Sequence, residues 1–208
     1  YLYALRRYVS IYYPIVFIDN SDTISPAIQN VGKKSKDFEY YTFTSTKSNL
    51  GKGHGEEEIL DFGFKNSSLL AQADRVIKIT GRYWIDNIVD LIEKIQDSNA
   101  DAHVNFGLNS SRADSRIIIF KPSFYIFYFK PCLEKYLDEP SKIFFENVLA
   151  QSVHKLMAER GVYEPWPVYP FYYGINGANG KEVNFKGIKR IKYNLFYKIK
   201  LWFMKQIV

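Results

Sequence analysis

The residues best suited to chemistry lie between Lys78 and Arg82, where an apolar segment ends in a cationic turn. Three of the four residues at 76–79 are β-branched and predict a strand. Residues 85–95 carry apolar side chains three and four positions apart and predict a helix. Open α/β sheets bind ligands where such strands end, and fixed cations there suit a phosphate-bearing substrate. The alternative is that both side chains are solvated charges beside an ordinary turn.

A glycine-rich segment at 51–55, Gly-Lys-Gly-His-Gly, is the second place where close contact with a ligand is expected. Its spacing is neither that of a dinucleotide-binding fingerprint nor that of a phosphate-binding loop. One interpretation is a flexible connector. The other is close approach of the backbone to a sugar nucleotide, because glycine has no side chain to block the contact.

Strand-like and helix-like segments alternate through the chain and must position these residues. Strands are expected at 15–18, 38–43, 76–79, 102–106 and 116–120, followed by an aromatic run at 123–129. Helices are expected at 24–32, 56–71, 85–95 and 141–160. This order predicts one mostly parallel sheet flanked by helices.

The segment Lys-Ile-Thr-Gly-Arg-Tyr at 78–83 resembles the Lys-x-(Thr/Ser)-Gly-Arg-Tyr element of bacterial surface-polysaccharide glycosyltransferases. Stretches at 15–21, 49–56 and 169–177 are similar to the same group in the same order. The resemblance implies a Rossmann-like (GT-A-like) fold. It also implies transfer of a sugar from a nucleotide-sugar donor to a lipid-linked glycan acceptor in capsule or O-antigen synthesis.

The resemblance further implies a donor site at the ends of the expected strands. Its expected members are Asp19, Asn20, Asn49, Gly51, Gly53, Glu56, Lys78, Thr80, Gly81, Arg82 and Tyr83. Asp114 and Arg116 are further candidates on their own pattern, because a polar loop before a strand offers both an acid and a cation. Most GT-A enzymes hold a divalent metal with an Asp-x-Asp pair, which is absent from the comparable position at 78–82. Manganese or magnesium is therefore allowed but not favoured as a cofactor, and Lys78 and Arg82 are expected to neutralise the diphosphate instead.

Inverting sugar transfer requires a carboxylate that takes the proton of the acceptor hydroxyl. Glu146 is the first candidate, because its aromatic neighbours favour proton uptake by a carboxylate. Asp86, close to the cationic turn, is the second. Each residue is also compatible with a plain acid on the surface of a helix.

The positive charge of the chain is concentrated in its carboxyl-terminal tail, residues 181–208. The net charge is +6 for all 208 residues, and the tail alone carries eight lysines and arginines against one acid. Residues 1–180 are therefore expected to form the catalytic domain and residues 181–208 a basic amphipathic helix. We expect this helix to bind an anionic membrane surface. The alternative is that its apolar stripe packs on the sheet.

The remaining features of the sequence narrow the expected location, partners and function of the protein. The single Cys132 and the lack of a secretory signal indicate a cytoplasmic protein, peripheral at the inner face of the cytoplasmic membrane. Charge confined to the tail argues against nucleic acid as a partner. The chain begins at Tyr1 in a helix-like segment, so we expect a first strand to be missing. Two alternative functions are a nucleotidyltransferase or other sugar-nucleotide-binding domain, and a non-enzymatic adaptor at the membrane.

Overall fold

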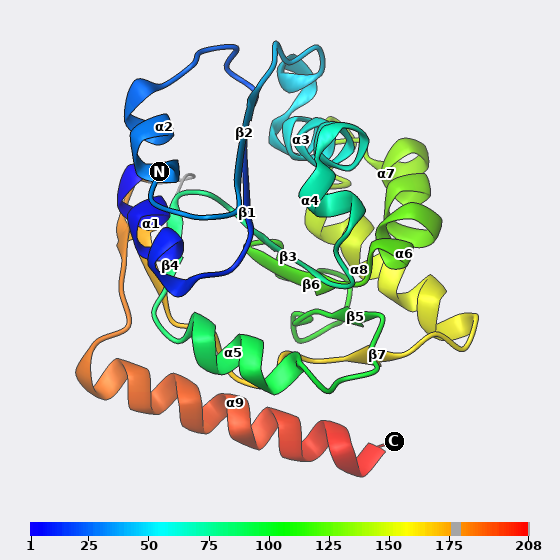
Figure 1. The fold of residues 1–208 in the computed structure, drawn as a ribbon. Helices are drawn as coiled ribbons and strands as arrows, with labels where there is room; N and C mark the ends of the chain where they lie inside the picture. The colour runs from blue at the N-terminus through cyan, green and yellow to red at the C-terminus, as the bar shows by residue number, and fades with distance from the viewer. Residues whose placement is uncertain (176–179, 208) are drawn as a thin grey trace.

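The computed structural model describes the backbone of residues 1–175 and 180–207 (Figure 1). It describes the side chains of residues 1–175 and 180–203. Asn176 and Gly177, which belong to the last of the resembling stretches, lie outside the described residues, as does the side chain of Lys205. None of the described helices is long and apolar enough to cross a membrane.

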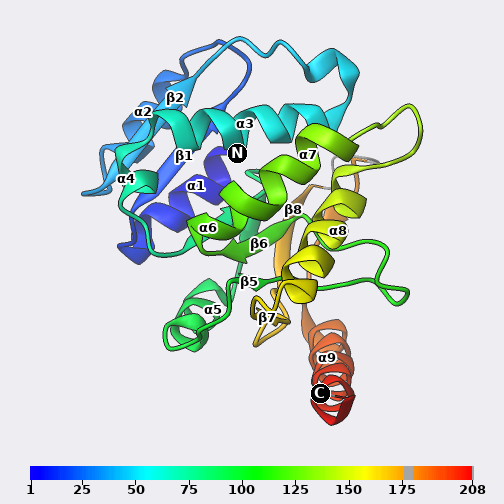
Figure 2. The ribbon, with the colours of Figure 1, turned by 90° about the vertical axis from the view of Figure 1, so that its right-hand side faces the viewer.

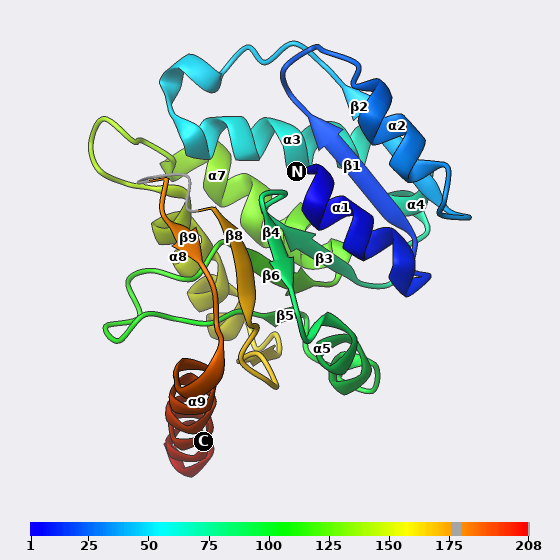
Figure 3. The same ribbon diagram turned by 90° about the vertical axis from the view of Figure 1, so that its left-hand side faces the viewer.

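The amino-terminal layer is a two-stranded parallel sheet between pairs of helices (Figures 1 and 3). Strand β1 (Ile15–Asp19) pairs with β2 (Phe38–Thr42), with Ile15 opposite Phe38. Helices α1 (Leu2–Tyr8) and α2 (Pro26–Gly32) cover one face, and α3 (Lys52–Asn66) and α4 (Ser68–Ala71) lie on the other. A small core of Leu5, Val9, Ile28 and Val31 joins α1 and the 3₁₀ turn that follows it (Val9–Ile11) to α2, because each element turns its apolar side inward.

The central layer is a four-stranded mixed sheet in the order β3-β6-β5-β7. Its strands are β3 (Val76–Ile79), β6 (Ile117–Phe120), β5 (Ala102–His103) and β7 (Tyr163–Glu164). Strand β6 runs antiparallel to both β3 and β5, whereas β5 and β7 are parallel. All four residues of β6 are buried because a hydrophobic cluster packs against each face, which explains its unbroken apolar sequence.

Helices from the second half of the chain cover one face of this sheet (Figure 2). They are α6 (Pro122–Phe124), a π-helix (Tyr125–Phe129), α7 (Lys130–Tyr136) and α8 (Phe145–Ala158). The opposite face packs on α5 (Ile88–Ile95) and on an antiparallel sheet in the order β4-β8-β9. Those strands are β4 (Tyr83–Ile85), β8 (Tyr172–Ile175) and β9 (Glu182–Val183), and the long helix α9 (Gly187–Ile207) follows.

The expectation of one mostly parallel, Rossmann-like (GT-A-like) sheet is wrong. Among the described residues, the strands form three small sheets, and only the two-stranded sheet of β1 and β2 is fully parallel. Two parallel strands need a crossover connection, usually a helix. The segment between β5 and β6 contains no helix, so the chain returns antiparallel.

Two segments differ locally from the expectation. Residues 83–85 form a strand, because Tyr83, Trp84 and Ile85 pair with β8, although 83 and 84 were expected in the turn and 85 at the start of the helix. The aromatic run at 123–129 is helical, since Pro122 begins a helix that continues through it.

Candidate functional site

An open cavity of about 490 Å³ brings four of the predicted site residues together: Tyr83, Asp114, Arg116 and Glu146. It lies where β4, the segment before β6 and the start of α8 meet. Other side chains on its wall are Asn105, Phe106, Arg112 and Ser115. The wall therefore combines two carboxylates with two guanidinium groups, a composition suited to a charged ligand.

Glu146 lies in the first turn of α8, where the helix dipole favours an acidic side chain. The hydroxyl of the buried Ser115 donates a hydrogen bond of 2.8 Å to Glu146 Oε1. The main-chain N–H of Phe144 donates to Asn147 Oδ1 at 3.1 Å and fixes the start of the helix. These contacts hold one oxygen of the Glu146 carboxylate at the cavity wall.

Arg116 and Asp114 form a fixed ion pair beside Glu146. Arg116 Nε lies 2.9 Å from Asp114 Oδ1, and the guanidinium carbon lies 4.2 Å from the centre of the Tyr172 ring. Burial alone would lower the pKa of Arg116. The hydrogen bonds and charge of Asp114 outweigh burial and raise that pKa above its usual value. The guanidinium therefore stays charged and is held rigidly between a carboxylate and an aromatic face.

Lys78 lies behind this wall and is only 12% exposed. Its ammonium group makes an ion pair with Glu56 and donates to Thr80 Oγ1 at 3.3 Å and to the carbonyl of Ser115 at 2.8 Å. Ser115 in turn holds Glu146. Ser115 thus connects the predicted donor residues Lys78, Glu56 and Thr80 to the candidate base Glu146. The positive charge of Lys78 is balanced within the protein by the carboxylate of Glu56.

The backbone of the glycine-rich segment closely approaches a carboxylate of the protein itself, and the predicted approach to a sugar nucleotide stays a prediction. Helix α3 begins at Lys52, inside this segment, and Gly51 precedes it with a φ of 143°, which favours glycine. Gly53 N–H donates to Glu139 Oε1 at 2.5 Å. A Cβ atom on Gly51 would collide with the carboxylate of Glu139. These glycines let the Glu139 carboxylate cap the helix start.

The structure places other predicted residues around the amino-terminal strands. Asp19 ends β1, accepts a hydrogen bond of 2.9 Å from Ser21 N–H, and lines a separate cavity of about 470 Å³. Asn20 lies near the start of α3, where its amide nitrogen would be 3.2 Å from a Cβ on Gly55. Asn49 belongs to a short 3₁₀ turn at Ser48–Leu50.

The cationic turn and the second candidate base have different surroundings. The Nε atom of Arg82 is buried and has no hydrogen-bond partner among the described residues. Gly81 lies against Tyr1, since a Cβ atom on this glycine would be 3.1 Å from the Tyr1 ring. Asp86 is not in the cavity wall, and its carboxylate pairs with Arg190 of α9 at 2.6 Å.

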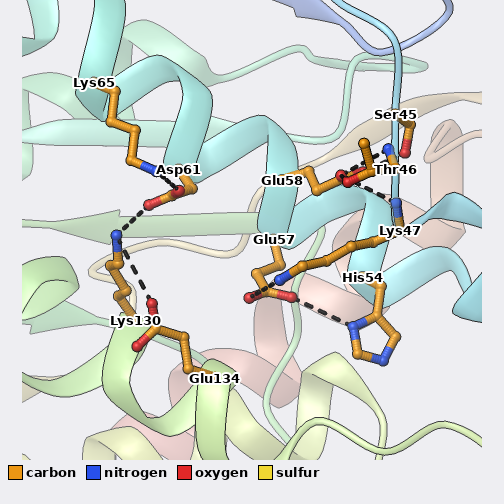
Figure 4. A network of polar contacts seen from close by, with 10 residues as sticks. All are labelled: Ser45, Thr46, Lys47, His54, Glu57, Glu58, Asp61, Lys65, Lys130 and Glu134. Atoms are coloured by element: carbon orange, nitrogen blue, oxygen red, sulfur yellow. Dashed lines mark hydrogen bonds and ion pairs between the residues drawn. The ribbon is translucent and has the colours of Figure 1, made fainter.

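A further polar network on α3 is structural (Figure 4). Glu57 is buried and contacts Lys47 at 3.0 Å and His54 at 3.3 Å. Burial alone would raise the pKa of Glu58, but hydrogen bonds from residues 45–47 outweigh it and lower the pKa to about 2. Because these carboxylates already have partners within the protein, we assign the network the role of fixing the segment before Gly51 against α3.

Sequence reasoning missed Asn105, Arg112 and Ser115 as members of the cavity wall. Arg112 and Ser115 belong to the polar segment at 109–115, and this segment was the signal that could have identified them. Only Asp114 was predicted as a site residue from that segment. Within the described residues, no group of three or more His, Cys, Asp or Glu side chains is placed to hold a metal ion.

Comparison with known proteins adds no relative: no family model matches the chain, and no curated protein matches it significantly.

Proposed function

We propose that this protein is a glycosyltransferase that moves a sugar from a nucleotide-sugar donor to a lipid-linked glycan in bacterial surface-polysaccharide synthesis. The observation that carries the proposal is the cavity in which Glu146, held by Ser115, faces the same space as Arg112 and Arg116. The Lys-Ile-Thr-Gly-Arg-Tyr resemblance at 78–83 supplies the class of reaction. The proposed location is the cytoplasmic face of the membrane.

In this proposal, Glu146 is the general base. Its carboxylate removes the proton of the acceptor hydroxyl while that oxygen attacks the anomeric carbon of the donor. The bond between the anomeric carbon and the diphosphate breaks, and the diphosphate leaves with the electron pair. Arg112 is exposed at the cavity and is the cation best placed to stabilise the developing negative charge, because Arg116 already pairs with Asp114.

Arg82 is proposed as a contact to the donor diphosphate. Its Nε atom is closed off from solvent, but Arg82 as a residue is partly exposed. A phosphate oxygen would therefore contact the outer nitrogens of the guanidinium, in a charge-assisted hydrogen bond. The next residue, Tyr83, lines the cavity, so this contact would lie beside the reaction space.

The test is a hydrolysis and transfer assay with a panel of nucleotide sugars, run with manganese, with magnesium and with EDTA. We expect release of nucleoside diphosphate from at least one donor, retained in EDTA. Glu146→Gln is expected to keep the fold and donor affinity and to lower transfer about 100-fold or more. Glu93→Gln, an exposed acid on α5, is the matched control and should keep full activity.

Three outcomes count against parts of the proposal. Near-native turnover of Glu146→Gln would exclude this residue as the base. Activity lost in EDTA and restored by manganese would contradict metal independence. Tight binding of nucleotide sugars with neither hydrolysis nor transfer would replace the proposal with a sugar-nucleotide-binding domain or a nucleotidyltransferase.

A further inference from the structure

Helix α9 lies at one end of the molecule in all three views and is attached to the body along one side (Figures 1, 2 and 3). Tyr197 is buried, and its hydroxyl donates to the carbonyl of Trp166 at 2.8 Å. Lys200 Nζ donates to Asn105 Oδ1 at 2.6 Å and to the carbonyl of Phe106 at 2.8 Å. These contacts fix which side of the helix faces the body.

The other side of α9 is an exposed apolar stripe. Its members follow helical spacing and are Ile188, Ile191, Leu195, Ile199 and Trp202. Their exposed fractions run from 44% at Ile199 to 84% at Ile188. The sequence left two arrangements open, packing on the sheet or binding to a membrane. The exposure of the stripe excludes the first of these in the described structure.

The charges on α9 indicate what the stripe would contact. The helix contains no acidic residue between Gly187 and Ile207. Exposed Lys192 and Lys198 border the stripe, whereas the ammonium group of Lys189 lies 4.8 Å from the centre of the buried Phe185 ring. The cations closer to the body are already occupied, Arg190 by Asp86 and Lys200 by the cavity wall. A second copy of this face would meet like charge, whereas a surface with anionic groups above an apolar interior matches both the lysines and the stripe.

We propose that α9 docks the protein on an anionic lipid bilayer, with the helix lying in the plane of the interface. The apolar stripe enters the boundary between headgroups and acyl chains, and the bordering lysines contact anionic headgroups. Trp202 and the neighbouring Phe203, both exposed, suit this zone because aromatic rings prefer the interface. The docking does not depend on the enzymatic proposal.

The test is flotation of the full chain with vesicles, in the absence of any nucleotide sugar. We expect the protein to float with vesicles that contain phosphatidylglycerol and to stay behind with pure phosphatidylcholine. Flotation should weaken as salt is raised, because the lysine contacts are screened. Trp202 fluorescence should shift to shorter wavelength on binding, and Trp202→Phe should remove that shift.

The double variant Ile191→Glu, Leu195→Glu should lose flotation while keeping the native circular dichroism, since both positions are exposed. The matched control is Met157→Glu, which places a charge at an exposed apolar position on α8. It should float like the unmodified protein. Equal flotation of the double variant, or equal binding to neutral vesicles, would overturn the proposal. So would a stripe-dependent dimer with no binding to vesicles. Failure of the sugar-transfer assay would leave these results unchanged.

Discussion

At the scale of single residues, the cavity depends on side chains that are held by other side chains. Ser115 is the clearest case, because its hydroxyl holds Glu146 and its carbonyl receives Lys78. Removing either charged partner therefore affects the other through a buried serine. The chemistry proposed for Glu146 rests on this positioning as much as on the carboxylate itself.

Arg82 differs because its buried Nε atom lacks a partner within the described residues. If it binds the diphosphate, Arg82→Ala should weaken affinity for the donor by about 1.5–3 kcal/mol, the range for a hydrogen bond to a charged group. Calorimetry with the free nucleoside diphosphate measures this directly. Arg6→Ala, an exposed arginine on α1, is the control and should bind normally. Unchanged affinity in Arg82→Ala would remove this residue from the donor site.

At the scale of elements, the start of α3 shows how a glycine pattern can serve packing between elements. Gly51 and Gly53 admit the carboxylate of Glu139, which comes from the segment between α7 and α8. An acidic group at this position stabilises the helix start through its N–H groups and its dipole. The same pattern is compatible with ligand binding, and sequence alone does not separate the two uses.

We predict that Gly53→Ala destabilises the protein by about 1 kcal/mol, because the cost of overpacking, about 1–3 kcal/mol, exceeds the roughly 1 kcal/mol that alanine gains over glycine in a helix. The added Cβ would lie 2.8 Å from Glu139 Oε1 and 3.1 Å from Phe145 Cβ. Thermal and urea unfolding measure the change. Gly107→Ala is the matched control for stability, because its Cβ would come no closer than 3.5 Å to another residue. A Gly53→Ala variant as stable as the control would contradict this account of the segment.

Local sequence patterns located most strands but did not determine how they pair. Strands predicted at 15–18, 38–43, 76–79 and 116–120 are present as β1, β2, β3 and β6. Their β-branched and aromatic residues are a local signal. Pairing is a long-range property, and β6 lies antiparallel to β3 although the alternating order predicted parallel strands. The fold prediction failed at this step.

The candidate site was predicted in part for the same reason. Glu146, Asp114, Arg116 and Tyr83 come from separate segments, and the fold brings them to one cavity. Their residue types indicated a functional role, but their spacing in the sequence did not predict that they lie close together in the fold. Asp86 shows the converse, because an acid close in sequence to the cationic turn pairs instead with Arg190, 104 positions away.

At the scale of the whole molecule, the abundance of tyrosine links the core to pH. The chain contains 17 tyrosines, and burial raises the pKa of several of them. For Tyr169, burial raises the pKa to about 12. Burial also raises the pKa of Tyr8, Tyr125, Tyr163, Tyr172 and Tyr197.

We predict that stability falls steeply above about pH 10, the ordinary pKa of tyrosine. Below that pH both states keep these phenols protonated, so the tyrosines add no pH dependence. Above it, the unfolded chain releases protons that the folded protein retains. Each buried tyrosine then lowers the free energy of unfolding by up to about 1.4 kcal/mol per pH unit. For Tyr169 this window extends to about pH 12.

An alkaline titration followed by tyrosinate absorbance and circular dichroism checks this. The buried tyrosines should ionise together with loss of structure. Tyr12→Phe should leave the unfolding step in place. Smooth ionisation of all tyrosines near pH 10 with structure retained would contradict the predicted coupling.

The separation of the strands into three sheets also has a consequence for the protein in concentrated solution. Strand β1 pairs only with β2, and β3 only with β6, so each has an edge with no strand beside it among the described residues. Open edges are templates for strands of other molecules and promote aggregation. The net charge of +6 opposes such encounters through mutual repulsion. Added salt screens this repulsion, so colloidal stability should be greatest in dilute buffer and should decline as ionic strength rises.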